Sequence, residues 1–317
     1  MMNIISYYFL LVISRIACLI PFSVLYLFSD AVYFILFYVI RYRRDVVLVN
    51  LSKSFPEKMD DELKFIEHRF YRYFCDSFFE NLTLPYISKK RLNKRFIYKN
   101  PDVFDSYFQN NKSIILVAAH YGNWEMSLNM QLFLKHKVFA AYKEQNNKGF
   151  DRFFIKTRGR IGLEPVLMNN IAKRLVKNIQ NGIPTVAYML GDQRPDMFNV
   201  RYWTTFLNQE TPVLLGSEKI SRKFNLPVFF LDIIKTGRGK YEATFQLLED
   251  QPMQTKEFEI TEKSTHYLEN MIKRDPTIWL WSHRRWKHRR FQDFLKMMNR
   301  TIDSPGVSYN PDILKKT

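Results

Sequence analysis

The sequence has 317 residues, enough for one large α/β domain or two small ones. It is 46% hydrophobic and 16% aromatic, which excludes an intrinsically disordered chain. The net charge of +17 favours anionic partners: nucleic acid, an acidic lipid surface or an acidic protein. Its two cysteines, Cys18 and Cys75, provide no disulfide framework, so we expect a reducing compartment.

The N-terminal segment is strongly apolar and ends at the basic cluster Arg41, Arg43 and Arg44. As an α-helix, residues 22–40 would be about long enough to span a bilayer. Asp30 opposes a spanning helix by about 2.5–3.5 kcal/mol, and a proline divides the segment into two pieces. The pattern therefore predicts a monotopic helical hairpin slightly ahead of a spanning helix, with the basic cluster on the cytoplasmic side.

The rest of the chain alternates between short apolar runs and segments of helical periodicity. The near-continuous apolar runs, typical of strands covered on both faces, are 113–119, 138–142, 184–190 and 227–234. Segments 60–82, 124–135, 171–182 and 212–225 have apolar residues at helical spacing. Residues 241–250 alternate and predict an antiparallel edge strand. We expect an α/β fold with a mostly parallel, helix-covered sheet.

This organisation predicts three parts. Residues 1–44 form a membrane-associated hydrophobic segment, residues 45–300 form the main domain, and residues 301–317 form a C-terminal tail.

Two of the apolar runs end in polar clusters, "HYGNWE" from His120 to Glu125 and "GDQRPD" from Gly191 to Asp196. In open α/β sheets, binding sites collect beyond the carboxyl ends of the strands. We therefore expect both clusters to lie on the same rim of the sheet.

The first cluster contains the groups needed for general-base chemistry. Gly122 permits a tight turn, and Asn123 can cap a helix from Trp124 whose N–H groups could face an oxyanion. Glu125 would then fold back to the imidazole of His120 and fix its tautomer. No serine or cysteine follows the strand, so direct transfer to a hydroxyl fits better than a covalent intermediate. The alternative is an ordinary structural histidine; the spacing is not typical of a metal site.

Over nearly its whole length the chain resembles the bacterial lipid A biosynthesis (lauroyl/myristoyl) acyltransferases, within the lysophospholipid acyltransferase superfamily. The blocks that carry the resemblance are His120 with Glu125, Arg158 in "TRGRIG", Asp192 with Gln193, and "IWLWSHRRWKHRR" near the C-terminus. Many relatives have a Phe-Gly element after the Asp-Gln pair, whereas this chain has "TTFLNQETPV". The pocket lining is therefore the part that the resemblance predicts least well.

The resemblance implies a glycerolipid-acyltransferase-like fold and an O-acyltransferase at the cytoplasmic face of the inner membrane. It would move a fatty acyl chain from acyl carrier protein, or less readily from coenzyme A, to a hydroxyl of a lipid A precursor or related lipid. A lysophospholipid or aminolipid acceptor is the alternative. No cofactor is implied beyond the donor thioester, and the basic charge suits acyl carrier protein and an anionic membrane surface.

The resemblance also implies roles for residues outside the two clusters. Arg158 and Arg160 could clamp phosphates, and Asp192 could orient Arg158 or an acceptor hydroxyl, beside Gln193. Arg284 and Arg285 could bind lipid headgroups. Plain alternatives are a solvated basic helix end for the arginines and a capping role for Asp192.

Two other classes of protein stay open. One is a membrane-anchored nucleic-acid-binding protein, suggested by the net charge and by "HRRWKHRR", although no nucleic-acid fold motif is present and we expect no nucleic-acid partner. The other is an inactive scaffold of the acyltransferase fold.

Overall fold

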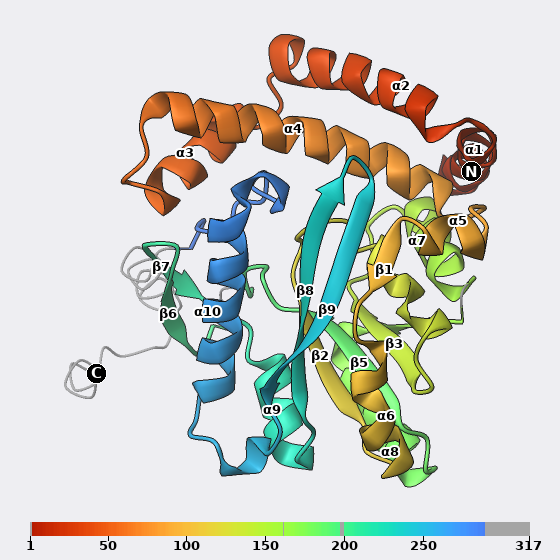
Figure 1. Ribbon diagram of the computed structural model, residues 1–317, viewed down its shortest axis with the longest axis vertical. Helices are drawn as coiled ribbons and strands as arrows, with labels where there is room; N and C mark the ends of the chain where they lie inside the picture. Colours follow the sequence, from red (N-terminus) through yellow and green to blue (C-terminus); the bar gives the residue numbers. More distant parts are fainter. Residues whose placement is uncertain (1, 161, 197–199, 289–317) are drawn as a thin grey trace, which may run out of the picture.

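The computed structural model describes residues 2–160, 162–196 and 200–288. Its centre is a seven-stranded sheet with the strand order β1-β9-β8-β2-β5-β3-β4 (Figure 1). The strands are β1 Phe96–Tyr98, β2 Ile114–Ala118, β3 Lys137–Tyr142, β4 Glu164–Leu167, β5 Thr185–Leu190, β8 Val228–Gly237 and β9 Lys240–Glu249. A separate antiparallel ribbon consists of β6 Trp203–Phe206 and β7 Gln209–Pro212.

The predicted α/β fold with a mostly parallel sheet is confirmed. Only β8 and β9 pair antiparallel within the sheet, and every other neighbouring pair is parallel. The prediction that residues 241–250 form an edge strand is wrong, because β1 pairs with β9 on its outer side. At three residues, β1 is too short to show a sequence pattern of its own.

Ten α-helices lie within the described residues. They are α1 Met2–Leu19, α2 Phe22–Phe34, α3 Arg44–Ser54, α4 Asp60–Thr83, α5 Lys89–Asn93, α6 Asp105–Gln109, α7 Lys148–Gly159, α8 Ile171–Gln180, α9 Gly216–Phe224 and α10 Glu259–Arg274. Helices α8, α9 and α10 pack against β5, β2 and the β8–β9 pair respectively. The helix expected from Trp124 is instead a 3₁₀-helix, Met126–Leu132, after a turn.

The central strands of the sheet, β2 and β5, are buried. All five residues of β2 are buried, as are the first four of β5, and this explains their near-continuous apolar sequences. Two covered strands that run side by side provide a rigid support for whatever follows their carboxyl ends.

The N-terminal helices α1 and α2 lie across α4, with Pro21 between them (Figure 1). Asp30 of α2 accepts a hydrogen bond of 2.6 Å from Nη2 of Arg238, which also binds Asp76 at 2.7 Å. The charge that opposes a spanning helix is therefore paired with the tip of the β8–β9 hairpin. Residues Phe22–Val39 are nonetheless long and apolar enough to cross a membrane, and a third of that stretch, 33%, is buried.

The outward faces of α1 and α2 are apolar. Exposed residues include Phe9, Val12, Ile16, Leu27, Phe28 and Phe34. The predicted tail, 301–317, and residues 289–300 of the predicted main domain lie outside the described residues.

Candidate active site

The site lies where β2 and β5 end. These strands are parallel neighbours, with Ala118 opposite Leu190, so the residues that follow them share one rim, as the sequence predicted. A cavity of about 350 Å³ opens there. Among the residues that line it are His120, Trp124, Glu125, Arg158, Gln193 and Arg194.

Asp192 holds His120 by two bonds. Its Oδ1 lies 2.7 Å from Nδ1 of the imidazole, and its Oδ2 accepts from the main-chain N–H of His120 at 2.9 Å. The indole Nε1–H of Trp279 donates to the same Oδ2 at 2.9 Å. Burial alone would raise the pKa of Asp192, but the neighbouring His120 and these hydrogen bonds lower it to about 2.

This arrangement decides which nitrogen of His120 is basic. The ionised Asp192 accepts a hydrogen bond from Nδ1–H of His120, so Nε2 carries the lone pair. Nε2 lies 3.0 Å from the amide nitrogen of Gln193, which is a donor. His120 therefore presents Nε2, with its lone pair, on the cavity side.

The prediction that Glu125 is the partner of His120 is wrong. Glu125 accepts two bonds from Arg158 of α7, at 3.1 Å from Nε and 2.5 Å from Nη2. Burial disfavours the charge of Arg158, yet Glu125 raises the pKa of the guanidinium. The prediction that Asp192 orients Arg158 is wrong for the same reason: the two carboxylates have exchanged partners.

Gly122 and Asn123 shape the turn and do not line the cavity. Gly122 has φ +56°, and a Cβ there would come within 2.7 Å of Cγ2 of Ile233. Asn123 is 0% exposed, donates to Glu80 at 2.8 Å and accepts from the main chain of Met126 at 3.0 Å. Neither residue lines the cavity, so a place for them in substrate binding finds no support here, whereas the turn at Gly122 and the capping bond of Asn123 are as predicted.

The turn is also held from behind by residues that sequence reasoning missed. Tyr73 of α4 donates to the carbonyl of Gly122 at 2.6 Å. Residues 278–280, in the C-terminal block, run beside the turn. The N–H of Gly122 donates to the main-chain carbonyl of Ile278 at 2.9 Å, and the N–H of Leu280 donates to the main-chain carbonyl of His120 at 3.1 Å. The tryptophans of that block could have indicated from the sequence that it packs near the site. Tyr73 could not, because it has the same spacing as the other core residues of its helix.

The remaining predicted arginines lie away from the cavity. Arg160 donates to the main-chain carbonyls of Leu84, at 2.7 Å, and Ile87. Arg284 is exposed and is not part of the cavity wall. Arg285 is 2% exposed and donates to the carbonyl of Pro212 at 2.8 Å. The guanidinium of Arg160 is used within the fold, so it is not free to clamp a phosphate in this structure. Arg284 faces solvent outside the cavity, and its predicted contact with lipid headgroups stays a prediction.

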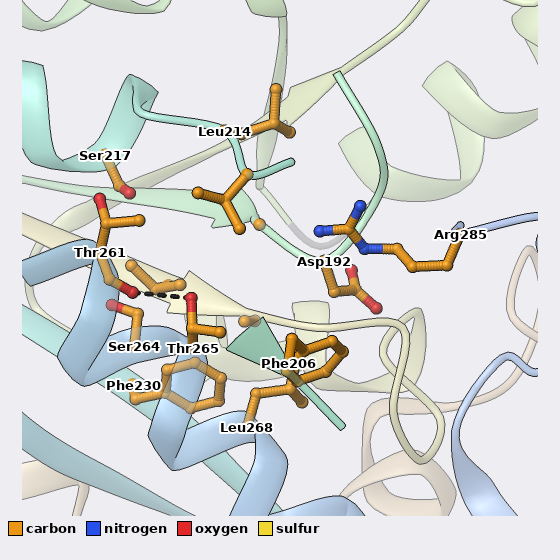
Figure 2. Close-up of a pocket in the computed structure, with 14 residues that line it drawn as sticks. Asp192, Phe206, Leu214, Ser217, Phe230, Thr261, Ser264, Thr265, Leu268 and Arg285 are labelled. Carbon is orange, nitrogen blue, oxygen red and sulfur yellow. Dashed lines mark hydrogen bonds between the residues drawn. The ribbon is translucent and has the colours of Figure 1, made fainter. Parts of the chain in front are cut away.

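A second, smaller cavity of about 40 Å³ lies behind Asp192 (Figure 2). Phe206, Phe230 and Leu268 form its apolar wall, and Arg285 extends toward Asp192 at its edge. Burial lowers the pKa of Arg285 to about 10. The space holds about one water-sized group, so a long acyl chain does not fit unless side chains move. Phe206 belongs to the segment that departs from the pattern of many relatives.

Comparisons with known proteins place the chain in a family. "Lipid A biosynthesis acyltransferase 2" of Shigella flexneri is 22% identical over 185 residues, 57% of this chain and 58% of that protein, so the match spans little more than half of this relative. The crystal structure of the 1-acyl-sn-glycerophosphate (LPA) acyltransferase PlsC from Thermotoga maritima covers 81% of this chain and 96% of its own, with 15% identity and a TM-score of 0.34. That likeness is too loose to carry an argument. The family model described as bacterial lipid A biosynthesis acyltransferase matches residues 1–288, and the chain therefore belongs to this family.

Proposed function

We propose that the protein is an O-acyltransferase with His120 as its general base. It transfers a fatty acyl chain from acyl carrier protein, or from coenzyme A, to a hydroxyl of a lipid A precursor or a related membrane lipid. The observation that carries the proposal is the basic Nε2 of His120, which faces a cavity of about 350 Å³ while Asp192 holds Nδ1. Membership of the acyltransferase family supports the same reaction class.

The reaction follows from this geometry in two steps. The acceptor hydroxyl donates to Nε2 of His120, in the place that the Gln193 amide occupies in the free protein. Its oxygen attacks the thioester carbonyl as its proton moves to Nε2, and Asp192 stabilises the imidazolium that forms. When the tetrahedral intermediate collapses, the C–S bond breaks and the thiolate takes the proton from His120.

The wall of the cavity suits a phosphate-bearing lipid. Arg158, Lys143 and Arg194 all line it, and Glu125 fixes the plane of the Arg158 guanidinium. Planar guanidinium groups bind phosphate oxygens well. Lipid A precursors and lysophospholipids both satisfy this requirement, and a lipid without phosphate satisfies it less well.

The apolar faces of α1 and α2 support attachment to the cytoplasmic face of the inner membrane. Because Asp30 is paired with Arg238, we propose that the two helices lie in the membrane surface rather than span it. The basic block offers less to a nucleic acid than its sequence suggests, because Arg285 is buried and Trp286 donates to Thr211 within the fold.

The test is the His120→Ala variant in a transfer assay from acyl carrier protein to a lipid acceptor. Loss of the general base should reduce turnover roughly 10²–10⁴-fold while circular dichroism stays unchanged. His266→Ala, at an exposed position of α10, is the matched control and should retain full activity. Near wild-type turnover of His120→Ala would refute the mechanism, and an inactive wild type would favour the scaffold alternative. Lipid mass spectra of a deletion strain complemented with each variant identify the acceptor.

A further inference from the structure

Helices α8 and α9 form a surface groove of about 460 Å³. Its floor is apolar and includes Val176 and Phe224. Its rims carry four exposed lysines, two on each helix and four residues apart: Lys173, Lys177, Lys219 and Lys223. We call this feature the lysine groove.

Among the described residues, the four lysines of the groove are not paired with acidic residues, although Glu164, which is bound to Arg174 and Lys137, lies near Lys173 and Lys177. Within the described part of the chain none of them forms an ion pair, and no aspartate or glutamate lines the groove. Other surface lysines, such as Lys137 and Lys263, are paired with glutamates. Four unpaired like charges repel one another, so an anionic occupant would stabilise the surface.

The two helices of the lysine groove begin close to the active-site cavity, and the groove lies away from the apolar N-terminal helices. Met168, shortly before α8, and Leu214, shortly before α9, both line the cavity that contains His120. Figure 1 shows α8 and α9 at the end of the molecule opposite to α1 and α2. A lipid surface bound by the apolar N-terminal helices therefore does not reach the groove, and this argues for a protein occupant.

We propose that the lysine groove binds an acidic, amphipathic helix of the protein that carries the acyl donor. Lysines four residues apart on a helix are separated by about one turn, roughly 6 Å, which matches carboxylates one turn apart on a docked helix. The apolar floor receives the apolar face of that helix, as in other helix-in-groove complexes. The inference rests on the proposed function, since the bound carrier would place its thioester at the mouth of the cavity.

The experiment compares two donors on the full-length protein. In the variant Lys173→Glu/Lys219→Glu, the KM for acyl carrier protein thioester should rise roughly tenfold or more, because charge reversal repels an acidic partner. Transfer from the uncharged acyl N-acetylcysteamine thioester should stay unchanged, since that donor needs no docking surface. The control, Lys53→Glu/Lys94→Glu, makes the same change in net charge at exposed lysines elsewhere and should behave as wild type with both donors.

Three results would overturn the inference: an unchanged KM for the carrier-linked donor, an equal loss with both donors, or an equal loss in the control. Failure of the proposed function has a different signature, namely no transfer by the wild type from either donor. In that case, calorimetric titration with holo acyl carrier protein still tests whether the lysine groove binds the carrier. The inference is supported if the carrier binds wild type more tightly than Lys173→Glu/Lys219→Glu and if salt weakens that binding. Equal binding to the two proteins rejects it.

Discussion

Asp192 and Glu125 are two carboxylates at one cavity that are held in different ways. Asp192, with a side chain 3% exposed, accepts N–H groups from three donors, one of them main chain. Glu125, 9% exposed, binds one arginine side chain that is itself 18% exposed. The first is fixed by the sheet and by the C-terminal block, whereas the second depends on a single helix. The difference shows that position relative to backbone donors, more than distance along the sequence, decides which acid serves the histidine.

The largest effect should come from Asp192→Asn. The amide can donate to Nδ1 of His120, which moves the proton to Nε2 and removes the base, so kcat should fall roughly 10³–10⁴-fold. Steady-state kinetics and circular dichroism on the same preparation check this. Glu125→Gln is the comparison and should keep at least a tenth of the activity. If Glu125→Gln is the more damaging change, the roles given to the two carboxylates must be exchanged.

A second effect concerns the Glu125–Arg158 pair. Arg158→Gln should raise the KM for a phosphate-bearing acceptor about tenfold and change kcat less, since the guanidinium binds and does not transfer protons. A double-mutant cycle should give a coupling energy of about 1 kcal/mol or more between Glu125→Gln and Arg158→Gln. Coupling of the same size between Asp192→Asn and Arg158→Gln would mean that the two carboxylates form one network.

A smaller effect should follow Trp279→Phe. This change removes one of the three N–H donors to Asp192 and keeps an aromatic ring in the core, so kcat should fall roughly three- to tenfold. Trp281→Phe removes a comparable bond, from the indole to the carbonyl of Pro276, but not to Asp192. Its kcat should therefore stay close to wild type. Equal losses in both variants would point to core packing as the cause.

The smallest effect concerns how the free energy of unfolding changes with pH. Asp192 and its neighbour His283 should affect it in different pH ranges. Burial lowers the pKa of His283 from 6.5 to about 4, so the unfolded state binds the proton first and stability falls between about pH 6.5 and 4. Asp192, with a pKa of about 2, loses its contribution only below about pH 4. In His283→Gln the free energy of unfolding should fall by about 2 kcal/mol less between pH 6.5 and 4 than in wild type, allowing for the partial exposure of the ring. Urea unfolding at pH 7, 5 and 3 measures both ranges; an unchanged slope between pH 7 and 5 contradicts the assignment.

The fold could be predicted because covered strands leave a direct signal, as in residues 113–119 and 184–190. The same signal placed His120 and Asp192 on one rim, since both follow such strands. The partner of His120 could not be predicted, because a local contact with Glu125 and a contact across two strands are equally compatible with the sequence. The outcome depends on the register between β2 and β5. The capping bond of Asn123 to the main chain of Met126 was predictable from its position before the helix. The contacts of Arg160 were not, because only the fold reveals which polar groups are used internally.

The strand-like contact between His120–Gly122 and Ile278–Leu280 has a consequence for biosynthesis. A ribosome makes the histidine turn early and its C-terminal neighbour near the end of the described chain. Until that neighbour emerges, the turn lacks two main-chain hydrogen bonds, and Asp192 lacks the indole of Trp279. A nascent chain, or one interrupted before residue 278, therefore already has its histidine but not the environment that makes it a base. The proposed mechanism therefore requires that synthesis has passed Leu280, well after both carboxylates and the histidine have been made.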